Sequence, residues 1–484
     1  MSSPLDNLRK PLQKLRRPLK AAEKAANTVT FGATDAIGKM VRIVPRSRNT
    51  ELLLLLFALG MNIYELIQIQ LSVIQIMRSD VWVYFLPPAI GALAIHVLLR
   101  LRASEADPLL LPLTVALNGL GISEIYRLDL AKEHLTNPNL FAGKQVIWTC
   151  IAMVAAMLVV YFVKSHLFLR RFIYISMVIG VALLLSPALP IIGKTINGAR
   201  LWIGIGSFTF QPGELAKIAL TIFFAGYLVS RRESLSIVGR RVLGVQLPRA
   251  RELGPILLVW VASLGVLVFE RDLGTSLLYF GLFLVMIYVA TGRAIYVATG
   301  LGMFLTGALV AGRFMSYVSG RVNAWLDPLN PANYNAIGGS YQLAQGNFGL
   351  AHGSLLGSGL GGGLPQLVPL AESDFIFSSL GEELGLAGVF VLLLTYLLLV
   401  SRGLRIGFTH NDDFSKLLAT GLSFVLALQT FIVVGGVTRV VPLTGLTTPF
   451  LAAGGSSLLA NWIIVGLLLR ISDSAGGHQR TVTL

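Results

Sequence analysis

Long apolar runs, separated by short polar turns, dominate the pattern of hydrophobic and polar positions along this chain. A run of roughly 17–25 apolar residues is long enough for one helix to cross the ~30 Å hydrocarbon core of a bilayer. The pattern therefore predicts twelve transmembrane helices. They are expected at residues 51–72, 82–100, 107–125, 144–164, 172–189, 212–230, 254–270, 273–291, 294–311, 385–401, 416–438 and 449–470.

Composition supports a membrane protein rather than a soluble domain. Of the 484 residues, 54% are hydrophobic and only 13% are charged, whereas soluble domains carry about 25% charged residues. The expected fold class is therefore an all-α polytopic membrane protein. The single cysteine, Cys150, excludes an intramolecular disulfide.

The net charge of +15 follows the predicted topology. Residues 1–48 carry eleven Lys or Arg and three acids, and further basic residues fill alternate loops such as 164–171 and 231–251. Because Lys and Arg collect in cytoplasmic loops, we expect both termini in the cytoplasm and no nucleic-acid partner. Residues 1–50 are then a basic cytoplasmic tail without the apolar core of a signal peptide. Residues 472–484 are expected to form a cytoplasmic C-terminal tail.

One loop, residues 312–384, is far longer than the others and is expected on the extracytoplasmic side. It has 73 residues and thirteen glycines. A loop of this length is usually functional or disordered, and its repeated aromatic and apolar residues favour an ordered one. Its glycine-rich part, LLGSGLGGGLPQLVP (355–369), is compatible either with close approach of the backbone to a ligand or with a flexible linker.

Charged residues near the ends of apolar runs are candidates for a functional site, because charge is costly inside a bilayer. In NGARLWIGIGSFTFQPGELAK (197–217), Glu214 falls in the first turn of a predicted helix and Lys217 follows at i+3 on the same face. A capped helix start with a local ion pair would explain this pattern in a soluble protein. At a membrane boundary we interpret it as part of a site. The same stretch supplies Arg200, Trp202 and Gln211.

Three further clusters carry charge. FERDLGTSLL (269–278) separates two apolar runs, and GRVNAWLDPLNP (320–331) contains Arg321 beside a turn that does not require it. LAESDFIFSSLGEELG (370–385) contains the densest group of acids in the chain, which are Glu372, Asp374, Glu382 and Glu383.

Other site chemistries find little support in the sequence. There is no HExxH, no cysteine pair, no GxxxxGK[ST], and no evident His or Asp partner for Ser456 or Ser457. These absences argue against a zinc hydrolase, a P-loop nucleotide site and a serine hydrolase. No cofactor is required, although a carboxylate-bound divalent cation (Mg or Mn) stays compatible with the sequence.

These clusters resemble motifs of the SEDS family of polytopic peptidoglycan glycosyltransferases, which includes RodA and FtsW. A further motif of that family is matched by PLTGLTTPFLAAGGSSLLAN (442–461), and all the motifs occur in the family's order. The resemblance covers residues 107–471 and implies a ten-helix core preceded by two additional helices within 51–100. The stretch DPLLLPLTVALNGLGISEIYRLD (107–129) and the two additional helices resemble those of actinobacterial members. The stretch VVGGVTRVVPLTGLTTPF (433–450) is more similar to RodA than to FtsW.

The chain departs from the family pattern at a few positions. Where the family's acidic loop usually reads PExHTDFIF, this chain has PLAESDFIF, so Leu370 replaces a glutamate and Glu372 stands at the histidine position. Asp374 matches the pattern. Leu201 stands before Trp202 where many members have arginine, and QPGE replaces the commoner QPSE.

The resemblance implies polymerisation of lipid II at the outer face of the cytoplasmic membrane. The 4-hydroxyl of an acceptor GlcNAc would attack C1 of a MurNAc with inversion, and polyprenyl diphosphate would leave. We expect Asp374 to be the general base, with a pKa raised by burial beside Glu372. Arg200, Lys217 and Arg321 would stabilise the diphosphate. Trp202, Gln211, Glu214 and Glu372 complete the expected substrate-binding set.

The expected partners are lipid II, a class B penicillin-binding protein with one transmembrane helix, and other proteins of the elongation complex. Residues 385–400 and the following span are candidates for docking that helix. Three alternatives stay open at this point. They are a FtsW-type division homologue with the same chemistry, a lipid II flippase and a non-catalytic scaffold.

Overall fold

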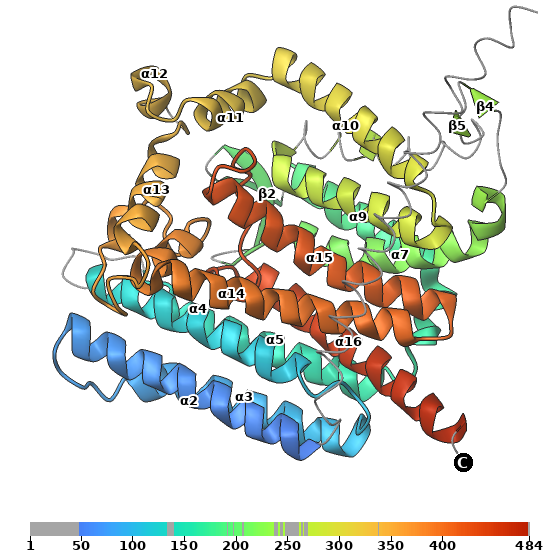
Figure 1. The fold of residues 1–484 in the computed structure, drawn as a ribbon, viewed down its shortest axis with the longest axis horizontal. Coiled ribbons are helices and arrows are strands. Elements are labelled where there is room, and N and C mark those ends of the chain that lie inside the picture. The colour runs from blue at the N-terminus through green and yellow to red at the C-terminus, as the bar shows by residue number, and fades with distance from the viewer. Residues whose placement is uncertain are drawn as a thin grey trace, which may run out of the picture. The chain divides into compact units, whose positions relative to one another are not determined.

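Helices account for most of the structure, which is a computed structural model (Figure 1). It describes residues 48–132, 140–190, 192–196, 198–205, 208–236, 241–242, 245–246, 261–262, 265, 270–336 and 338–482. The predicted basic tail and most of the predicted span at 254–270 lie outside the described residues. Residues 51–484 form one compact unit.

Eleven helices coincide with predicted spans. They are α2 (Arg48–Val73), α3 (Val81–Arg102), α4 (Leu110–Lys132), α5 (Ala142–Phe162), α6 (Ile173–Leu185), α7 (Pro212–Ser236), α9 (Leu273–Thr291), α10 (Ala294–Phe314), α14 (Ile376–Thr409), α15 (Asp413–Val437) and α16 (Gly455–Val482). Among the described residues, ten helical stretches are long and apolar enough to span a membrane. The helix α4 is not among the ten, because Glu124, Arg127 and Asp129 interrupt its apolar sequence.

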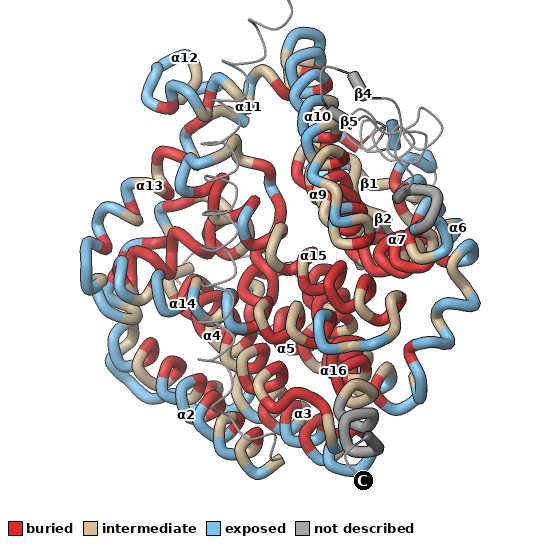
Figure 2. The backbone as a smooth tube through the Cα atoms, turned by 45° about the vertical axis from the view of Figure 1, so that its right-hand side comes forward, coloured by how far each residue is buried: buried red, intermediate tan, exposed pale blue. Residues whose placement is uncertain are grey.

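The centre of the bundle is formed by α15 and α16, which are buried over most of their length (Figure 2). The strongest helix pairings are α5 with α16, α14 with α15, and α6 with α7. The outer helices α3, α6 and α10 keep long apolar side chains exposed, as helices facing lipid do. A buried ion pair joins Arg402 of α14 to Asp107, which precedes α4. Arg402 lies one residue beyond the predicted span 385–401, and the helix α14 continues past it to Thr409.

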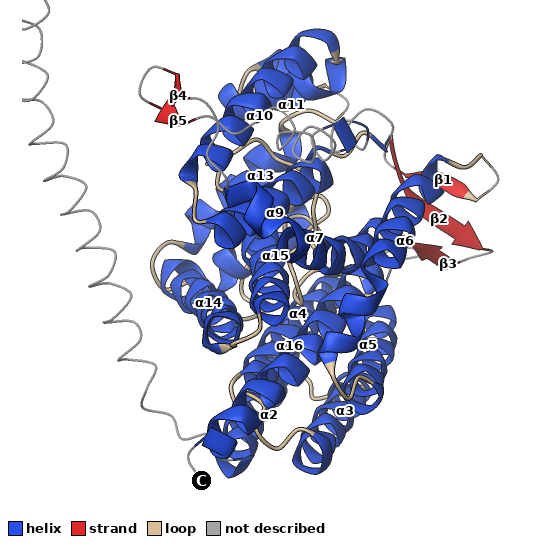
Figure 3. Ribbon diagram, turned by 90° about the vertical axis from the view of Figure 1, so that its right-hand side faces the viewer, coloured by secondary structure: helices blue, strands red, loops and turns tan. Residues whose placement is uncertain are grey.

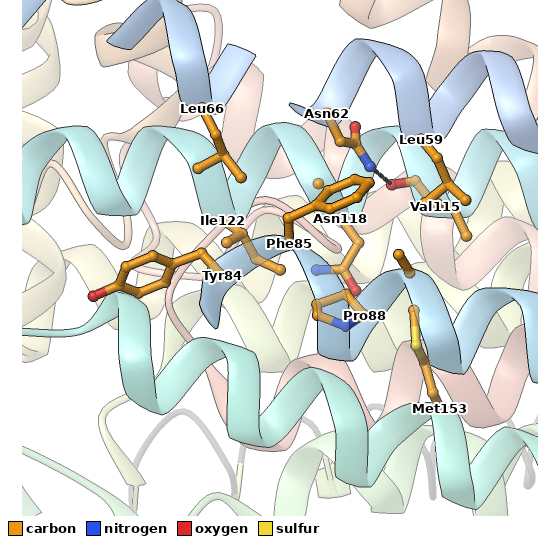
Figure 4. Close-up of a pocket in the computed structure, with 12 residues that line it drawn as sticks. Leu59, Asn62, Leu66, Tyr84, Phe85, Pro88, Val115, Asn118, Ile122 and Met153 are labelled. Carbon is orange, nitrogen blue, oxygen red and sulfur yellow. Dashed lines mark hydrogen bonds between the residues drawn. The ribbon is translucent and has the colours of Figure 1, made fainter. Parts of the chain in front are cut away.

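The two additional N-terminal helices, α2 and α3, lie at one edge of the bundle beside α4 and α5 (Figure 1). Glu51 of α2 and His96 of α3 are buried and 2.6 Å apart. A small cavity lies between α2, α3, α4 and α5, and at its edge Asn62 donates a hydrogen bond of 3.1 Å to the carbonyl of Val115 (Figure 4). The pair α2 and α3 is therefore packed against α4 through polar as well as apolar contacts.

A small antiparallel sheet, with strand order β1-β2-β3, precedes α7 (Figure 3). It comprises β1 (Gly193–Ile196), β2 (Ala199–Ile205) and β3 (Phe208–Phe210). Lys194 pairs with Trp202 across the first two strands, and Ile203 pairs with Phe210 across the last two. A second pair of short strands, β4 (Arg241–Val242) and β5 (Val245–Gln246), follows α7. The sequence predicted only loops in both regions, because these strands are too short to show a clear alternation.

The predicted long loop, residues 312–384, is ordered and mostly helical. It contains α11 (Ser316–Leu326), α12 (Pro331–Tyr334), α13 (Tyr341–Gly353) and the short 3₁₀ helix η4 (Pro365–Leu367). The side chain of Asn330 caps α12 by accepting a hydrogen bond from the backbone N–H of Ala332, as the Asn-Pro turn predicts. This segment leads directly into α14.

A break at Gly385 divides α14 into two helical parts. Gly385 has φ +66° and ψ −174°, a conformation that is essentially restricted to glycine. The backbone N–H groups of Ser358 and Gly359 bond to the carbonyls of Glu382 and Glu383 beside the break. Gly357 is also left-handed, with φ +82°. The glycine-rich segment is therefore folded tightly against α14, and the flexible-linker interpretation is wrong.

We predict that Gly385→Ala destabilises the protein. Its Cβ would lie 2.2 Å from the backbone nitrogen of Gly357, so strain and overlap together should cost about 2–5 kcal/mol. The measurement is the thermal unfolding midpoint of the purified protein in detergent, where the variant should melt several degrees lower. Gly302→Ala in α10 is the matched control, because its Cβ meets nothing within 4 Å. Equal melting of the two variants would contradict the strained conformation at Gly385.

Candidate active site

Asp374 lies in a tight turn just before α14. The backbone N–H groups of Ser373 and Phe375 both bond to the carbonyl of Leu370, which fixes this turn. The Asp374 side chain is partly exposed. A Cβ added at Gly445, in the segment between α15 and α16, would lie 3.6 Å from Asp374 Oδ2. Asp374 is thus positioned where the end of the 312–384 segment meets the α15–α16 connection.

Two charged side chains from other elements act on Asp374. Arg321 of α11 donates a hydrogen bond of 3.1 Å to the carbonyl of Leu443, and its guanidinium lies 5.3 Å from the centroid of the Tyr317 ring. Asp272 caps the N-terminus of α9 by accepting a hydrogen bond of 3.0 Å from the backbone N–H of Thr275. The clusters around Arg321, Asp272 and Asp374, which are distant in sequence, therefore meet at one place.

The environment of Asp374 suits a base that works near neutral pH. Burial raises the pKa of Asp374 to about 6, against the opposing charge of Arg321 and with support from Asp272 and Glu372. Burial likewise raises the pKa of Asp272. The elevated pKa predicted for Asp374 from the sequence is confirmed, and desolvation is its main cause.

Glu372, two residues before Asp374, is held on both its side chain and its backbone. Lys132 at the end of α4 contacts Glu372 Oε2 at 3.1 Å, and the Glu372 carbonyl accepts a hydrogen bond of 2.7 Å from Ala453. Sequence reasoning did not select Lys132. The only signal in the sequence for Lys132 was a basic residue seven positions after the predicted span 107–125, in a loop expected on the outer side.

Glu214 and Lys217 form the ion pair that their spacing predicted. Lys217 Nζ lies 2.6 Å from Glu214 Oε2, 2.9 Å from Gln429 Oε1 and 2.9 Å from Asn461 Oδ1. The three acceptors use all three ammonium donors and come from α7, α15 and α16. Lys217 is only 1% exposed, so this cation joins three helices in the core instead of facing an open surface.

The remaining candidates lie near the start of α7. Arg200 and Trp202 are on β2, and an Arg200 nitrogen donates a hydrogen bond of 3.2 Å to the carbonyl of Leu189. The backbone N–H of Gln211 donates a hydrogen bond of 2.9 Å to Ser456 Oγ at the start of α16. In the described part of the chain, no hydrogen bond or ion pair joins Arg200, Trp202 or Gln211 to Asp374.

Glu382 and Glu383 hold the glycine-rich segment. Glu383 pairs with Arg127 of α4 and accepts a hydrogen bond of 2.8 Å from the backbone N–H of Gly361. Glu382 accepts one of 2.9 Å from Leu364. From their place at the start of the predicted span 385–401, these acids could either favour a helix N-terminus or pair with basic residues of the site. The helix α14 already begins at Ile376, and Glu383 pairs with Arg127 of α4. The only signal in the sequence for Arg127 was a charge two positions beyond the predicted span 107–125.

A metal site is not evident. Across the residues that the structure describes, no group of three or more His, Cys, Asp or Glu side chains is arranged to hold a metal ion.

We predict that Lys217→Met strongly destabilises the protein, because it leaves Glu214 buried without its cation. Breaking a buried pair in this way costs about 3–5 kcal/mol. Thermal unfolding in detergent should show a large decrease in the melting temperature. The double variant Lys217→Met/Glu214→Gln should recover part of that loss, since it removes the unpaired charge. A single variant that melts like the wild type would show that the ion pair does not hold α7, α15 and α16 together.

Comparison with known proteins gives a consistent family. The model of the FtsW, RodA and SpoVE family, described as "Cell cycle protein", matches residues 108–476. The chain is 45% identical to "Peptidoglycan glycosyltransferase RodA" of Mycobacterium tuberculosis over 90% of this chain and 93% of that protein. It is 31% identical to a probable peptidoglycan glycosyltransferase FtsW of Trichlorobacter lovleyi over 77% of this chain and 94% of that protein.

Solved structures show the same fold. A chain from a structure described as "Structural coordination of polymerization and crosslinking by a peptidoglycan synthase complex" has 26% identity and a TM-score of 0.60, over 76% of this chain and 98% of that one. A mutant of the Thermus thermophilus rod shape determining protein RodA has 25% identity and a TM-score of 0.51, over 76% and 97%.

Proposed function

This chain belongs to the FtsW, RodA and SpoVE family of cell cycle proteins, and on that premise we propose that it polymerises lipid II into glycan strands during cell elongation. Relatives at 43% and 45% identity are named peptidoglycan glycosyltransferases, and the chain is an enzyme of this class. The observation that carries the proposal is the position of Asp374, partly exposed beside Arg321 with a pKa of about 6.

Asp374 is the proposed general base. A sugar hydroxyl is a weak nucleophile and needs a base within hydrogen-bond reach. At neutral pH a carboxyl with a pKa of about 6 is mostly ionised, and it accepts a proton more readily than an ordinary aspartate. The base would take the proton of the acceptor 4-hydroxyl while that oxygen attacks C1 of the donor MurNAc.

The leaving diphosphate requires cationic stabilisation rather than a proton. Arg321 is the preferred candidate, because its guanidinium is only partly buried and acts on Asp374. Arg200, which is also partly exposed, is the second. We revise the expectation for Lys217: with all three donors engaged, it positions the helices instead of binding diphosphate. Glu214 then serves to hold Lys217, while Trp202, Gln211 and Glu372 remain proposed substrate-binding residues.

The proposed orientation follows the distribution of basic residues. Both termini would be cytoplasmic, which is consistent with the basic residues of the predicted inner loops. Asp374 and the 312–384 segment would then be extracytoplasmic, at the surface where a lipid-linked donor presents its sugars.

We further propose that the single transmembrane helix of a class B penicillin-binding protein docks between α14 and α15. An apolar groove lies there, lined by Leu393, Tyr396 and Val400 of α14 and by Phe431 and Val434 of α15. The groove is within the segment that the sequence analysis selected for docking. A structurally similar protein comes from a peptidoglycan synthase complex, which supports such a partner.

A role in division is the second candidate, because FtsW proteins are also among the relatives. Identity of 45% to RodA over 90% of the chain, against 31% to FtsW over 77%, favours elongation. Depletion in the native cell separates the two: loss of cell shape supports elongation, while filaments without septa would support division.

We predict that Asp374→Ala and Asp374→Asn reduce polymerisation of lipid II by the purified protein at least about 100-fold, since general-base catalysis commonly contributes 10²–10⁴. Glycan products can be separated by gel electrophoresis, and melting temperatures check folding. Asp413→Asn is the control, because Asp413 is an exposed residue at the start of α15 that pairs with Arg232. Full activity of folded Asp374 variants would eliminate this residue as the base. Transfer of lipid II across vesicles without any polymer would favour a flippase.

We also predict an acid limb in the pH profile of polymerisation. The base acts in its ionised form, so the rate should be highest above pH 6 and fall as the pH decreases through about 6. Below that value the rate should decrease about tenfold per pH unit. Initial rates measured across a buffer series test this expectation. An acid limb near the usual aspartate value of about 4 would contradict the raised pKa.

A further inference from the structure

The acidic turn that carries Asp374 is anchored to α4 by one lysine. We infer that Lys132, in the last turn of α4, is a positioning residue that holds Glu372 and screens its charge from Asp374. This inference rests on the proposed function, because it concerns the residue proposed as the base. The contact joins residues 240 positions apart, and Lys132 lies outside every motif quoted from the sequence.

The geometry restrains Glu372 from two sides. Its carboxylate contacts Lys132 Nζ at 3.1 Å, and its carbonyl accepts a hydrogen bond of 2.7 Å from Ala453. Glu372 is 8% exposed, and the Lys132 side chain is 24% exposed. The pair is therefore largely removed from water, where a charge acts on its neighbours more strongly than at the surface. The two-residue separation between Glu372 and Asp374 couples any movement of the pair to the base.

The charges around Asp374 explain why Lys132 matters. Asp374 faces Arg321 and Tyr317 from α11, Asp272 from the start of α9, and Glu372 from its own turn. Glu372 in turn faces Lys132 and Asp129 from α4. One arginine and two further carboxylates therefore act on Asp374. Lys132 adds a second cation to this group through its contact with Glu372. Without it, the full negative charge of Glu372 would act on Asp374 and favour its protonated, inactive form.

A second contact from the same helix holds the other end of the acidic stretch. Arg127 of α4 pairs with Glu383, and it also donates hydrogen bonds to Gln366 and to the carbonyl of Gly363. Residues 363–383, including the Asp374 turn, are therefore attached to α4 at both ends. Of the two cations, only Lys132 acts on an acid next to Asp374, so Lys132 is the one whose loss should change protonation.

The experiment compares pH profiles of lipid II polymerisation for the purified full-length protein and its Lys132→Met and Lys132→Arg variants. We expect the acid limb of Lys132→Met to move to higher pH by at least about half a unit. Melting temperatures check that the variant is folded, because the largely buried Glu372 loses its cation. Lys132→Arg should restore the limb. Lys416→Met in α15 removes one lysine away from the site and should leave the limb unchanged.

Glu372→Gln provides a test of opposite sign. It leaves the positive charge of Lys132 uncompensated near Asp374, so the acid limb should move to lower pH. Because the two single variants are expected to shift in opposite directions, a general loss of folding cannot imitate both results. An acid limb in Lys132→Met identical to the wild type, or the same shift in both Lys132 variants, would overturn the inference.

The outcomes also separate this inference from the proposed function. If folded Asp374→Ala polymerises lipid II normally, the assignment of the base fails, whatever Lys132 does. If Asp374→Ala is inactive while Lys132→Met keeps the wild-type profile, the base stands and only the role of Lys132 fails.

Discussion

Every charge buried among these apolar helices needs a partner, and this constraint organises the rest of the structure. An unpaired ion in a low-dielectric interior is strongly unfavourable, so buried charges occur in pairs or networks. Lys217 joins three helices through three acceptors, Arg127 joins α4 to α14 through Glu383, and Arg402 pairs with Asp107. These contacts connect helices that are far apart in sequence. Apolar packing alone would only weakly determine how such helices lie against one another in a membrane.

The same rule distinguishes Asp374 from the other acids. Glu214, Glu372 and Glu383 each have a cation within ion-pair distance. Asp374 remains partly exposed, with Arg321 and two further acids acting on it from nearby, and its pKa rises to about 6. A carboxyl with more negative than positive charge around it accepts a proton more readily than an ordinary one. A raised pKa at a partly exposed position is therefore typical of a catalytic residue.

The acidic stretch 370–385 therefore has two physical functions. Its first half forms the turn that presents Asp374, and its second half fixes the glycine-rich segment through Glu382 and Glu383. Glycines are needed there because the backbone crosses α14 at Gly385 with no room for a side chain. The additional helix α3 packs on α5 and α4. The helix α2 contacts α4, which carries Arg127 and Lys132, through hydrogen bonds of Asn62 to Val115 and of Gln70 to Tyr126.

The sequence by itself determined the helical class, the positions of the apolar helices and the candidate acids, because helix length, hydropathy and the i+3 spacing of Glu214 and Lys217 are local properties. It also indicated the direction of the Asp374 pKa. Only the tertiary structure showed the small sheet before α7, the break in α14 and the helices within residues 312–384. It alone identified Lys132 and Arg127 as partners and enclosed Lys217 between α15 and α16. The contacts Lys132–Glu372, Arg127–Glu383 and Lys217–Gln429 join residues 240, 256 and 212 positions apart. Local sequence carries no record of which buried charge will meet which partner.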